Sequence, residues 1–381
     1  MNVVVVVDSL DLSTGGGVGT FIYDLCYELS LRKNVKTYLV GIIKDQTEND
    51  PLRQQLIKQK VHVISLNACS RKDAIVHFLK YVNSFRVIIR EISYGENTIC
   101  NLHLKLGCLI GSYASLGLKN VYCVETYHNT YKNYLLQCWA MAPIIKKYIC
   151  VSNAAMEEMH RRFCVPYKKL ISIPNGVNRE LIRAKVNAID EQRNLSFIVI
   201  SVGRLSYEKN ILLSAKAFLL LDNTNYRYVI IGDGPEKEEL IRIIKDKNNI
   251  EYLGPKSRED VLNYIYNADI VLIPSLWEGR SILMLEAIAL GKPLIISDCE
   301  GLREPFSELP LKKDEQVRVT KFGYLVRENS EQGIAYAIIH FYKHPELHNN
   351  MIEEVNRVSQ CNNMDNVVNA YLNTFSNIMG I

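Results

Sequence analysis

The chain has 381 residues, of which 48% are hydrophobic and 23% charged, with a formal net charge of +4. This is the composition of a folded globular protein, and the chain is too long for one ordinary core, so we expect two domains. No apolar run approaches about 18 residues, which argues against a membrane-spanning helix. No basic run with interleaved aromatic residues occurs, which argues against a nucleic-acid partner.

The start of the chain and its cysteines indicate where the protein works. Met1-Asn2 is followed at once by five valines, without the basic start and cleavage region of a secretory signal. The ten cysteines are scattered, mostly through apolar stretches, and include no Cys-x-x-Cys pair. Buried, reduced thiols explain this usage better than disulfides or a metal. We therefore expect a cytoplasmic protein.

The charge is distributed unevenly along the chain. Residues 1–175 contain 21 Lys and Arg against 13 Asp and Glu, whereas the remainder is acidic. The basic half suggests an anionic partner such as a membrane surface or a phosphorylated acceptor, and ordinary surface lysine explains it equally well. Three pairs of adjacent basic residues could form a basic face: Lys146-Lys147, Arg161-Arg162 and Lys168-Lys169.

A glycine-rich segment follows the first predicted strand, Val3–Val7. Gly15-Gly16-Gly17-Val18-Gly19 leads into a predicted helix that begins near Phe21. Glycines at a strand-to-helix turn let backbone N–H groups approach an anion. The dinucleotide fingerprint fails because position 20 is Thr20, and no Gly-Lys-Ser/Thr follows for a P-loop. Close approach to a ligand and a flexible turn both remain open.

The rest of the first half alternates between predicted strands and helices. His128 lies just past the end of one strand, which makes it a candidate ligand contact, and Ser152 is a good helix N-cap. The predicted strands are Thr37–Ile43, Val61–Leu66, Val87–Ile92, Val121–Thr126 and Tyr148–Val151, and the predicted helices include Ala74–Phe85 and Gly107–Leu116.

The second half opens with a strand at Phe197–Val202. Arg204 and Lys209 follow it, at the carboxyl end of a strand and beside a helix start, where their charges suit a diphosphate. The alternative interpretation is that Arg204 and Lys209 are ordinary surface charges. Two further strands follow, at Tyr228–Ile231 and Ile250–Leu253, and the second ends in Gly254-Pro255-Lys256.

The most informative stretch runs from Asp269 to Ile296. Ile270–Ile273 reads as a buried strand, Ser281 opens an apolar helix that Gly291 stops, and Leu294–Ile296 reads as the next strand. Glu278 lies in the loop and Glu286 about two turns into the helix, and neither has an obvious basic partner nearby in sequence. An unpaired charge inside an apolar run is costly, which favours a functional role over a solvated residue for Glu286.

The spacing of Glu278 and Glu286, with seven residues between them, is the basis of a family resemblance. Glu-x7-Glu within strand–Pro-Ser-x-x-Glu-Gly–helix–Gly-Lys-Pro–strand resembles the motif of retaining family-four glycosyltransferases. Val-Ser-Asn at 151–153 and Ile-Pro-Asn-Gly-Val at 173–177 are similar to that family's crossing into its second domain. One departure is that the family usually has Phe-Gly after Glu-Gly, where this chain has Arg280-Ser281.

The resemblance implies an α/β protein of the GT-B fold, with two doubly wound Rossmann-like domains facing a central cleft. Residues 1–175 would form the acceptor-side domain and residues 176–361 the donor-binding domain. The last helix, within 362–381, would pack back on the first domain.

The resemblance also implies roles for particular residues. The predicted catalytic residues are Glu278, which would contact the donor sugar, His128, near the sugar's sixth carbon, and Arg204 with Lys209, which would bind the diphosphate. His103 resembles a second, less constant histidine. The predicted donor-binding residues are Gly16, Gly17, Gly254, Pro255, Ser281, Ile282, Leu283 and Glu286.

The implied reaction moves a sugar from a UDP- or GDP-sugar to an acceptor hydroxyl with retention, in polysaccharide or glycolipid synthesis. No metal is expected, because the chain has no Asp-x-Asp pair. The acceptor would be a carbohydrate or lipid-linked saccharide, reached at the inner face of the cell membrane through anionic lipid. The alternatives are a nucleotide-sugar 2-epimerase of the same architecture and a non-catalytic carbohydrate-binding protein, which Arg280-Ser281 keeps open.

Overall fold

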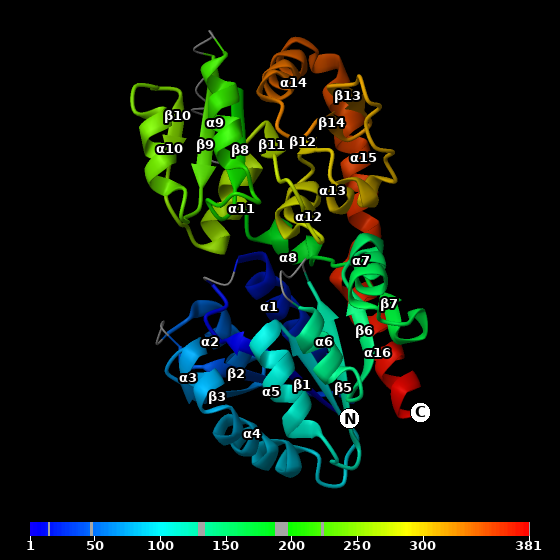
Figure 1. Ribbon diagram of the computed structural model, residues 1–381. Helices are drawn as coiled ribbons and strands as arrows, with labels where there is room; N and C mark the ends of the chain where they lie inside the picture. Colours follow the sequence, from blue (N-terminus) through cyan, green and yellow to red (C-terminus); the bar gives the residue numbers. More distant parts are fainter. Residues whose placement is uncertain (14–15, 46–48, 129–133, 187–196, 222–224, 381) are drawn as a thin grey trace. The chain divides into compact units, whose positions relative to one another are not determined.

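The protein consists of two compact units. The computed structural model describes the chain except for residues 14–15, 46–48, 129–133, 187–196, 222–224 and 381. The first unit comprises Met1–Gly176 together with Met364–Ile381, and the second comprises Val177–Asn363. Each unit is a sheet flanked by helices (Figure 1), so the predicted α/β fold class is confirmed.

The first unit is built on a parallel seven-stranded sheet in the order β3-β2-β1-β4-β5-β6-β7. The strand order reverses between β1 and β4, and ligands bind open α/β sheets at such switch points. The strands are β1 (Asn2–Ser9), β2 (Lys36–Ile43), β3 (His62–Ala68), β4 (Thr98–His103), β5 (Val121–Tyr127), β6 (Ile145–Cys150) and β7 (Leu170–Ser172). The helices are α1 (Gly16–Ser30), α2 (Pro51–Lys58), α3 (Arg71–Val76), α4 (Phe78–Ile92), α5 (Lys105–Ser115), α6 (Leu135–Met141), α7 (Asn153–Phe163) and α16 (Met364–Met379).

The second unit repeats this plan with the order β10-β9-β8-β11-β12-β14-β13, in which only β13 pairs antiparallel. Its switch point lies between β8 and β11. The strands are β8 (Phe197–Val202), β9 (Tyr226–Ile231), β10 (Ile250–Tyr252), β11 (Ile270–Ile273), β12 (Leu294–Ser297), β13 (Val317–Thr320) and β14 (Gly323–Val326). The helices are α8 (Arg179–Ala184), α9 (Ile211–Leu219), α10 (Lys237–Ile244), α11 (Arg258–Asn267), α12 (Ile282–Ala289), α13 (Glu300–Arg303), α14 (Glu331–Lys343) and α15 (His348–Cys361).

The central strands are apolar because helices cover both faces of each sheet. Val3 to Val6 of β1 and Ile270 of β11 are fully buried, as expected for strands inside a parallel sheet. The last helix, α16, packs against α1, and its Tyr371 hydroxyl lies 3.2 Å from the Thr126 hydroxyl on β5. Among the described residues, no helix combines the length and apolarity needed to cross a membrane.

Two boundaries differ from the sequence expectations. The predicted strand at Val87–Ile92 is wrong, because these residues form the end of α4. Tyr81, Phe85 and Ile89 of that helix are buried, and their spacing of four places them on one helical face, which overrides the local β-branched composition. The first helix begins at Gly16 and not near Phe21, so the described glycines of the loop form its first turn. Gly15 lies outside the described residues.

A buried acid occupies the core of the first unit. Glu125 on β5 is 1% exposed, and the Tyr134 hydroxyl donates a hydrogen bond to its carboxylate. Burial raises the pKa of Glu125 to about 7, an effect that the hydrogen bond from Tyr134 opposes. The folded protein therefore favours the protonated acid, whose stabilising contribution is complete below the unfolded pKa of about 4.3.

We predict that this contribution is lost as the pH rises through about 7. The Glu125→Gln variant keeps an acceptor for Tyr134 and cannot ionise. Its advantage in unfolding free energy over the parent should grow by an amount on the order of 2–3 kcal/mol between pH 4.5 and 8. Urea unfolding in a Trp277→Phe background, where Trp139 alone reports on the first unit, measures this. A pH-independent difference would contradict the assignment.

Candidate functional site

The loops after β8 and β11 meet at the switch point of the second unit. Lys209 Nζ lies 2.5 Å from Glu278 Oε1, and the Ser275 hydroxyl donates to the same oxygen at 2.9 Å. The two loops are also joined through their backbones, since the Leu276 N–H donates to the Glu208 carbonyl at 2.9 Å. Folding thus brings together a predicted cation and a predicted carboxylate that are 69 residues apart in sequence.

The Glu278 side chain is 8% exposed and that of Lys209 is 30% exposed. Both line one groove, with Ser201, Val202, Ile211, Leu272, Ile273, Pro274, Ser275, Ser281 and Leu283. A carboxylate so far removed from water needs a cation beside it, and Lys209 meets that need. The ammonium group of Lys209 is the more accessible of the two charges.

Glu286 is the second buried carboxylate. Its side chain is 7% exposed, and Arg258 Nε donates to Glu286 Oε1 at 3.0 Å. Arg258 is the first residue of α11, where a basic side chain is unfavourable because the helix N-terminus is itself positive. This unfavourable placement is the sequence signal that could have identified Arg258. No proximity in sequence indicates it, because the two residues lie in different strand–helix units.

The predicted helix start at Ser281 is confirmed. Its hydroxyl accepts a hydrogen bond from the Met284 N–H, and α12 begins with Ile282 and Leu283. This turn presents Leu283 and Ser281 to the groove and carries Glu286 into the interior.

The remaining predicted residues of the second unit are more exposed. Arg204 lies on the exposed start of the loop after β8, and Pro255 is exposed after β10. Gly254 has a φ of +68°, a conformation that favours glycine, and its carbonyl accepts from the Gly232 N–H at 3.0 Å. The backbone after β10 is thereby fixed to the backbone after β9.

Gly301 packs against the backbone of the loop that carries Glu278. A Cβ atom on Gly301 of α13 would lie 2.1 Å from the Glu278 carbonyl oxygen and 2.8 Å from that of Gly279. Only the absence of a side chain permits this approach. The loop that carries Glu278 is therefore enclosed between α13 and the loop after β8.

The first unit gathers polar groups at its own switch point. Asp8 at the end of β1 accepts hydrogen bonds from the Leu106 and Gly107 N–H groups at 3.0 and 2.9 Å, and Arg71 lies 3.3 Å away. Burial raises the pKa of Asp8, and the hydrogen bond from Gly107 and the charge of Arg71 oppose it. Gly16, with a φ of +60°, and Gly17 are exposed at the start of α1.

The two histidines form a buried pair. His103 Nδ1 lies 2.7 Å from His128 Nε2, and the Phe21 ring packs edge-on to His128 with centroids 5.3 Å apart. His103 is 0% exposed and His128 6% exposed. Burial lowers the pKa of both residues, that of His128 to about 3, so both rings are neutral at pH 7. One ring must donate and the other accept.

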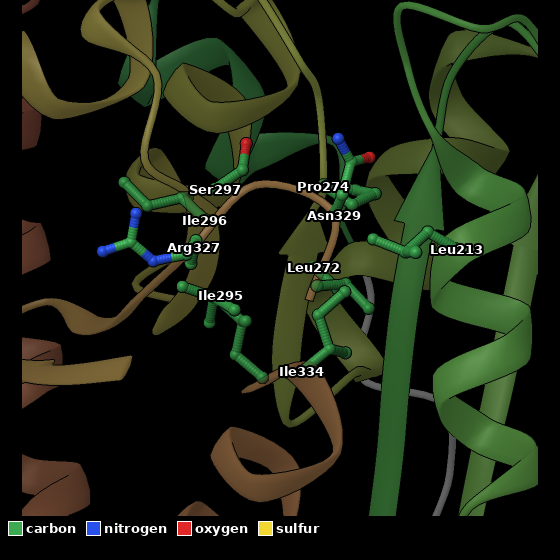
Figure 2. Close-up of a pocket in the computed structure, with 10 residues that line it drawn as sticks. Leu213, Leu272, Pro274, Ile295, Ile296, Ser297, Arg327, Asn329 and Ile334 are labelled. Atoms are coloured by element: carbon green, nitrogen blue, oxygen red, sulfur yellow. The ribbon is translucent and has the colours of Figure 1, made fainter. Parts of the chain in front are cut away.

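A small, mostly apolar pocket adjoins the groove at the ends of β11, β12 and β14, and the two share Leu272 and Pro274. In Figure 2, Leu272, Ile295 and Ile334 project into it, whereas the Arg327 guanidinium points away. Leu272, Ile295 and Ile334 belong to the main core of the second unit. The pocket thus lies at the end of that core, beside the carboxyl ends of the strands. Over the described residues, no group of three or more His, Cys, Asp or Glu side chains could hold a metal.

Two family models together cover most of the chain. Residues 15–181 match Glycosyltransferase Family 4, and residues 179–358 match Glycosyl transferases group 1. The chain belongs to this glycosyltransferase family. The boundary between the matched regions lies close to the boundary between the two units at 176 and 177.

Two curated relatives of the chain have a lipid in their names. A UDP-Gal:alpha-D-GlcNAc-diphosphoundecaprenol alpha-1,3-galactosyltransferase of Escherichia coli is 32% identical over 167 residues, which are 40% of this chain and 43% of that protein. The chain therefore aligns with less than half of that relative's length. An alpha-monoglucosyldiacylglycerol synthase of Acholeplasma laidlawii is 25% identical over 334 residues, covering 80% of this chain and 79% of that protein.

Solved structures confirm the GT-B fold. A glycosyltransferase from Rickettsia africae superposes with a TM-score of 0.77 at 17% identity, covering 99% of this chain and 98% of its own. Anabaena Alr3699/HepE in complex with UDP-glucose gives 0.78 at 16% identity, covering 99% of this chain and 100% of its own. At these identities the likeness establishes the fold alone.

The buried pair of Arg258 and Glu286 generates a stability prediction. Arg258→Met leaves the Glu286 carboxylate buried without this cation, which should cost about 3–5 kcal/mol of unfolding free energy. Urea unfolding in a Trp139→Phe background, with Trp277 reporting on the second unit, measures this loss.

Two further variants test the interpretation. Adding Glu286→Gln to Arg258→Met should recover most of the lost stability, because the buried charge is removed. Arg227→Met breaks the exposed Arg227–Glu251 pair, whose side chains are 42% and 38% exposed, and should cost about 1 kcal/mol or less. Equal losses for Arg258→Met and Arg227→Met would show that Glu286 is not held as a buried charge.

Proposed function

We propose that this protein is a retaining glycosyltransferase that moves a sugar from a nucleoside diphosphate to an acceptor hydroxyl. The observation that carries the proposal is the Lys209–Glu278 pair, which lies in a groove at the switch point of the second unit. Membership of the glycosyltransferase family supports it. The relatives' acceptors point to polysaccharide or glycolipid synthesis.

In the proposed reaction the bond between the sugar's anomeric carbon and the diphosphate oxygen breaks. A bond from the acceptor oxygen forms on the same face of the sugar, and the acceptor's proton passes to the leaving phosphate. Negative charge grows on the diphosphate, so preorganised cations lower the barrier. Arg204 and Lys209 are assigned this role.

The two glutamates are assigned to the two ends of the donor. Glu278 accepts hydrogen bonds from sugar hydroxyls, and Lys209 turns from Glu278 toward the diphosphate when the donor binds. Glu286 accepts hydrogen bonds from the ribose hydroxyls, and Arg258 holds that carboxylate in place through its own hydrogen bond. The backbone at Gly254 and Pro255 holds the base, and Ser281, Ile282 and Leu283 present the start of α12 to the donor.

Residues of the first unit are assigned to binding the acceptor and to part of the contact with the donor. The exposed N–H groups at Gly16 and Gly17 open α1 and suit an anionic oxygen. His128 is neutral, so it suits a hydroxyl of the sugar better than a phosphate. His103 orients His128 through their shared hydrogen bond.

A lipid-linked acceptor would place the protein at a membrane. The E. coli relative acts on a diphosphoundecaprenol-linked sugar, which suggests an acceptor of that class. The three basic pairs noted in the sequence are partly engaged, because Arg161 and Arg162 pair with Glu157 and Glu158, and Lys147 and Lys169 donate to backbone carbonyls.

We infer that α3 and the start of α4 form a better candidate for a membrane face. Ile75, Val76 and Leu79 are 63%, 66% and 72% exposed. Lys72 and Lys80 are exposed in the same segment. We call these five residues the α3–α4 patch. It combines apolar side chains that enter the headgroup region with lysines that each contribute about 1 kcal/mol near an anionic surface.

The site assignment predicts how binding and turnover respond to substitution. By calorimetry, UDP or GDP should bind the parent, and Arg204→Ala or Lys209→Ala should weaken binding and lower turnover about 10²–10³-fold. Glu286→Gln should retain part of the affinity and Glu286→Ala should lose most of it, and the 2′-deoxy nucleotide should bind the parent less tightly. A chelator should leave turnover unchanged, because the proposed charge stabilisation uses side chains.

Lys216→Ala on α9 is the control for the loss of a lysine. Unchanged turnover in both Arg204→Ala and Lys209→Ala would refute the site. Incubation of the sugar nucleotide without acceptor should give only slow hydrolysis, and an epimeric sugar nucleotide would instead indicate a 2-epimerase.

The α3–α4 patch predicts a salt-sensitive attachment to anionic vesicles. Co-sedimentation with vesicles that contain phosphatidylglycerol should exceed that with neutral vesicles at low salt and should fade as salt rises. The Ile75→Ser/Leu79→Ser variant should bind at least several-fold less. Leu309→Ser, at an equally exposed leucine of the second unit (73%), is the control and should bind like the parent. Equal binding to neutral and anionic vesicles would rule out the attachment to anionic lipid, and no binding to either would rule out the membrane contact.

A further inference from the structure

Arg280 is a buried cation in the loop that carries Glu278. It is 8% exposed, and it lies in sequence between Glu278 and Ser281, the N-cap of α12. Burial lowers the pKa of its guanidinium to about 10, an effect that the Glu304 carboxylate opposes, so the group is still charged at pH 7. Burying this charge is costly compared with burying an apolar side chain, and its contacts must compensate.

The contacts of Arg280 point toward the end of α15. Its Nη2 donates to the Asn362 side-chain oxygen, and its Nη1 lies 4.0 Å from Glu304. Among the described residues, its Nε has no hydrogen-bond partner. The hydrogen bond of this cation is therefore to a neutral amide and not to a carboxylate.

Asn362 lies where the chain passes between the two units. The second unit begins at Val177 and ends at Asn363. The Val177 N–H donates to the Asn362 carbonyl at 3.0 Å, and Val177 pairs with Asn363 in an isolated parallel bridge. The Asn362 side-chain nitrogen also donates to the Val358 carbonyl at 2.7 Å. Asn362 thus joins the incoming segment, the outgoing segment and Arg280.

The far end of α12 is attached to the same segments. Arg183 on α8, just after the incoming crossing, donates to the Ala289 carbonyl at 2.7 Å and to the Asn356 side chain on α15 at 2.6 Å. The helix that carries Glu286 is therefore held at its start through Arg280 and at its end through Arg183. Both attachments are made to residues close to Val177 and Asn362, where the chain passes between the two units. We call these two points the crossings.

We propose that Arg280 is a positioning residue that couples the loop carrying Glu278 to the two crossings at Val177 and Asn362. A ligand that orders the loop also restrains Arg280, and the restrained guanidinium stabilises the hydrogen bond between Val177 and Asn362. The coupling is reciprocal, so a change at the crossing alters the loop equally. The ligand half of this proposal rests on the proposed function, and the crossing half does not.

Hydrogen exchange followed by mass spectrometry tests the coupling, with UDP and GDP as the probes. In the parent, the bound nucleotide should slow exchange at the Val177 amide about fivefold or more. Arg280→Met and Asn362→Ala should each abolish this slowing, and the double variant should add nothing further. Arg357→Met is the matched control, because Arg357 is an exposed arginine on α15 paired with Glu354, and it should behave like the parent.

A merely space-filling Arg280 would give a different result. Replacing a buried charge with a similar apolar side chain is often neutral or stabilising, so Arg280→Met should retain its melting temperature while losing the coupling. Asn362→Asp keeps an acceptor oxygen and should restore the slowing. If Arg280→Met does not fold, Arg280→Lys, which keeps the charge and loses the planar fork, replaces it. Nucleotide protection at Val177 that persists without the Arg280 side chain or its fork would overturn the proposal.

The measurement without ligand separates this proposal from the proposed function. Arg280→Met should speed exchange at Val177, and Asn362→Ala should speed exchange in residues 276–284, both in the absence of nucleotide. If neither nucleotide binds, the proposed function fails while these two effects still test the coupling. If neither effect occurs, the coupling is refuted whether or not the nucleotide binds.

Discussion

The structure of the second unit depends on the burial of negative charge at the carboxyl end of a parallel sheet. Glu278 and Glu286 are both withdrawn from water. Each is paired with a cation from a different segment, Lys209 in the loop after β8 and Arg258 at the start of α11. Moving either cation would remove a charged partner from a buried carboxylate, which is costly. The two charge pairs therefore help to determine the positions of the segments that carry them.

This mutual dependence explains which features could be predicted from the sequence. The strands at Phe197–Val202 and Ile270–Ile273 were predictable because a strand buried on both faces is a short, continuous apolar run. The spacing of Glu278 and Glu286 is local, so the motif was visible. The partner Arg258 was not, because the pairing arises only when separate strand–helix units pack together. Val87–Ile92 was wrongly predicted because its β-branched composition favours a strand locally, whereas Ile89 continues the buried helical face that begins at Tyr81 and Phe85.

The first unit shows a different limit of sequence reasoning. His128 follows a strand, as a ligand contact would, and no local pattern indicates that His103 lies against it. β4 went unpredicted as a strand because it mixes apolar residues with Asn101 and His103, and these polar side chains are satisfied in part by neighbouring strands. The Asn101 side-chain oxygen, for example, accepts a hydrogen bond from Thr126 on β5. Polar residues in a buried strand depend on partners that local patterns do not reveal.

The close approach of Gly301 to the Glu278 loop has a consequence for how this protein can change over evolutionary time. Any side chain at position 301 would push against the carbonyls of Glu278 and Gly279, so this site is closed to gradual drift. Arg280, directly after these residues, is held by its side chain, so a substitution there need not move the backbone. Changes in the site should therefore arise through side chains such as that of Arg280, while the absence of a side chain at Gly301 keeps the backbone beside α13 in place.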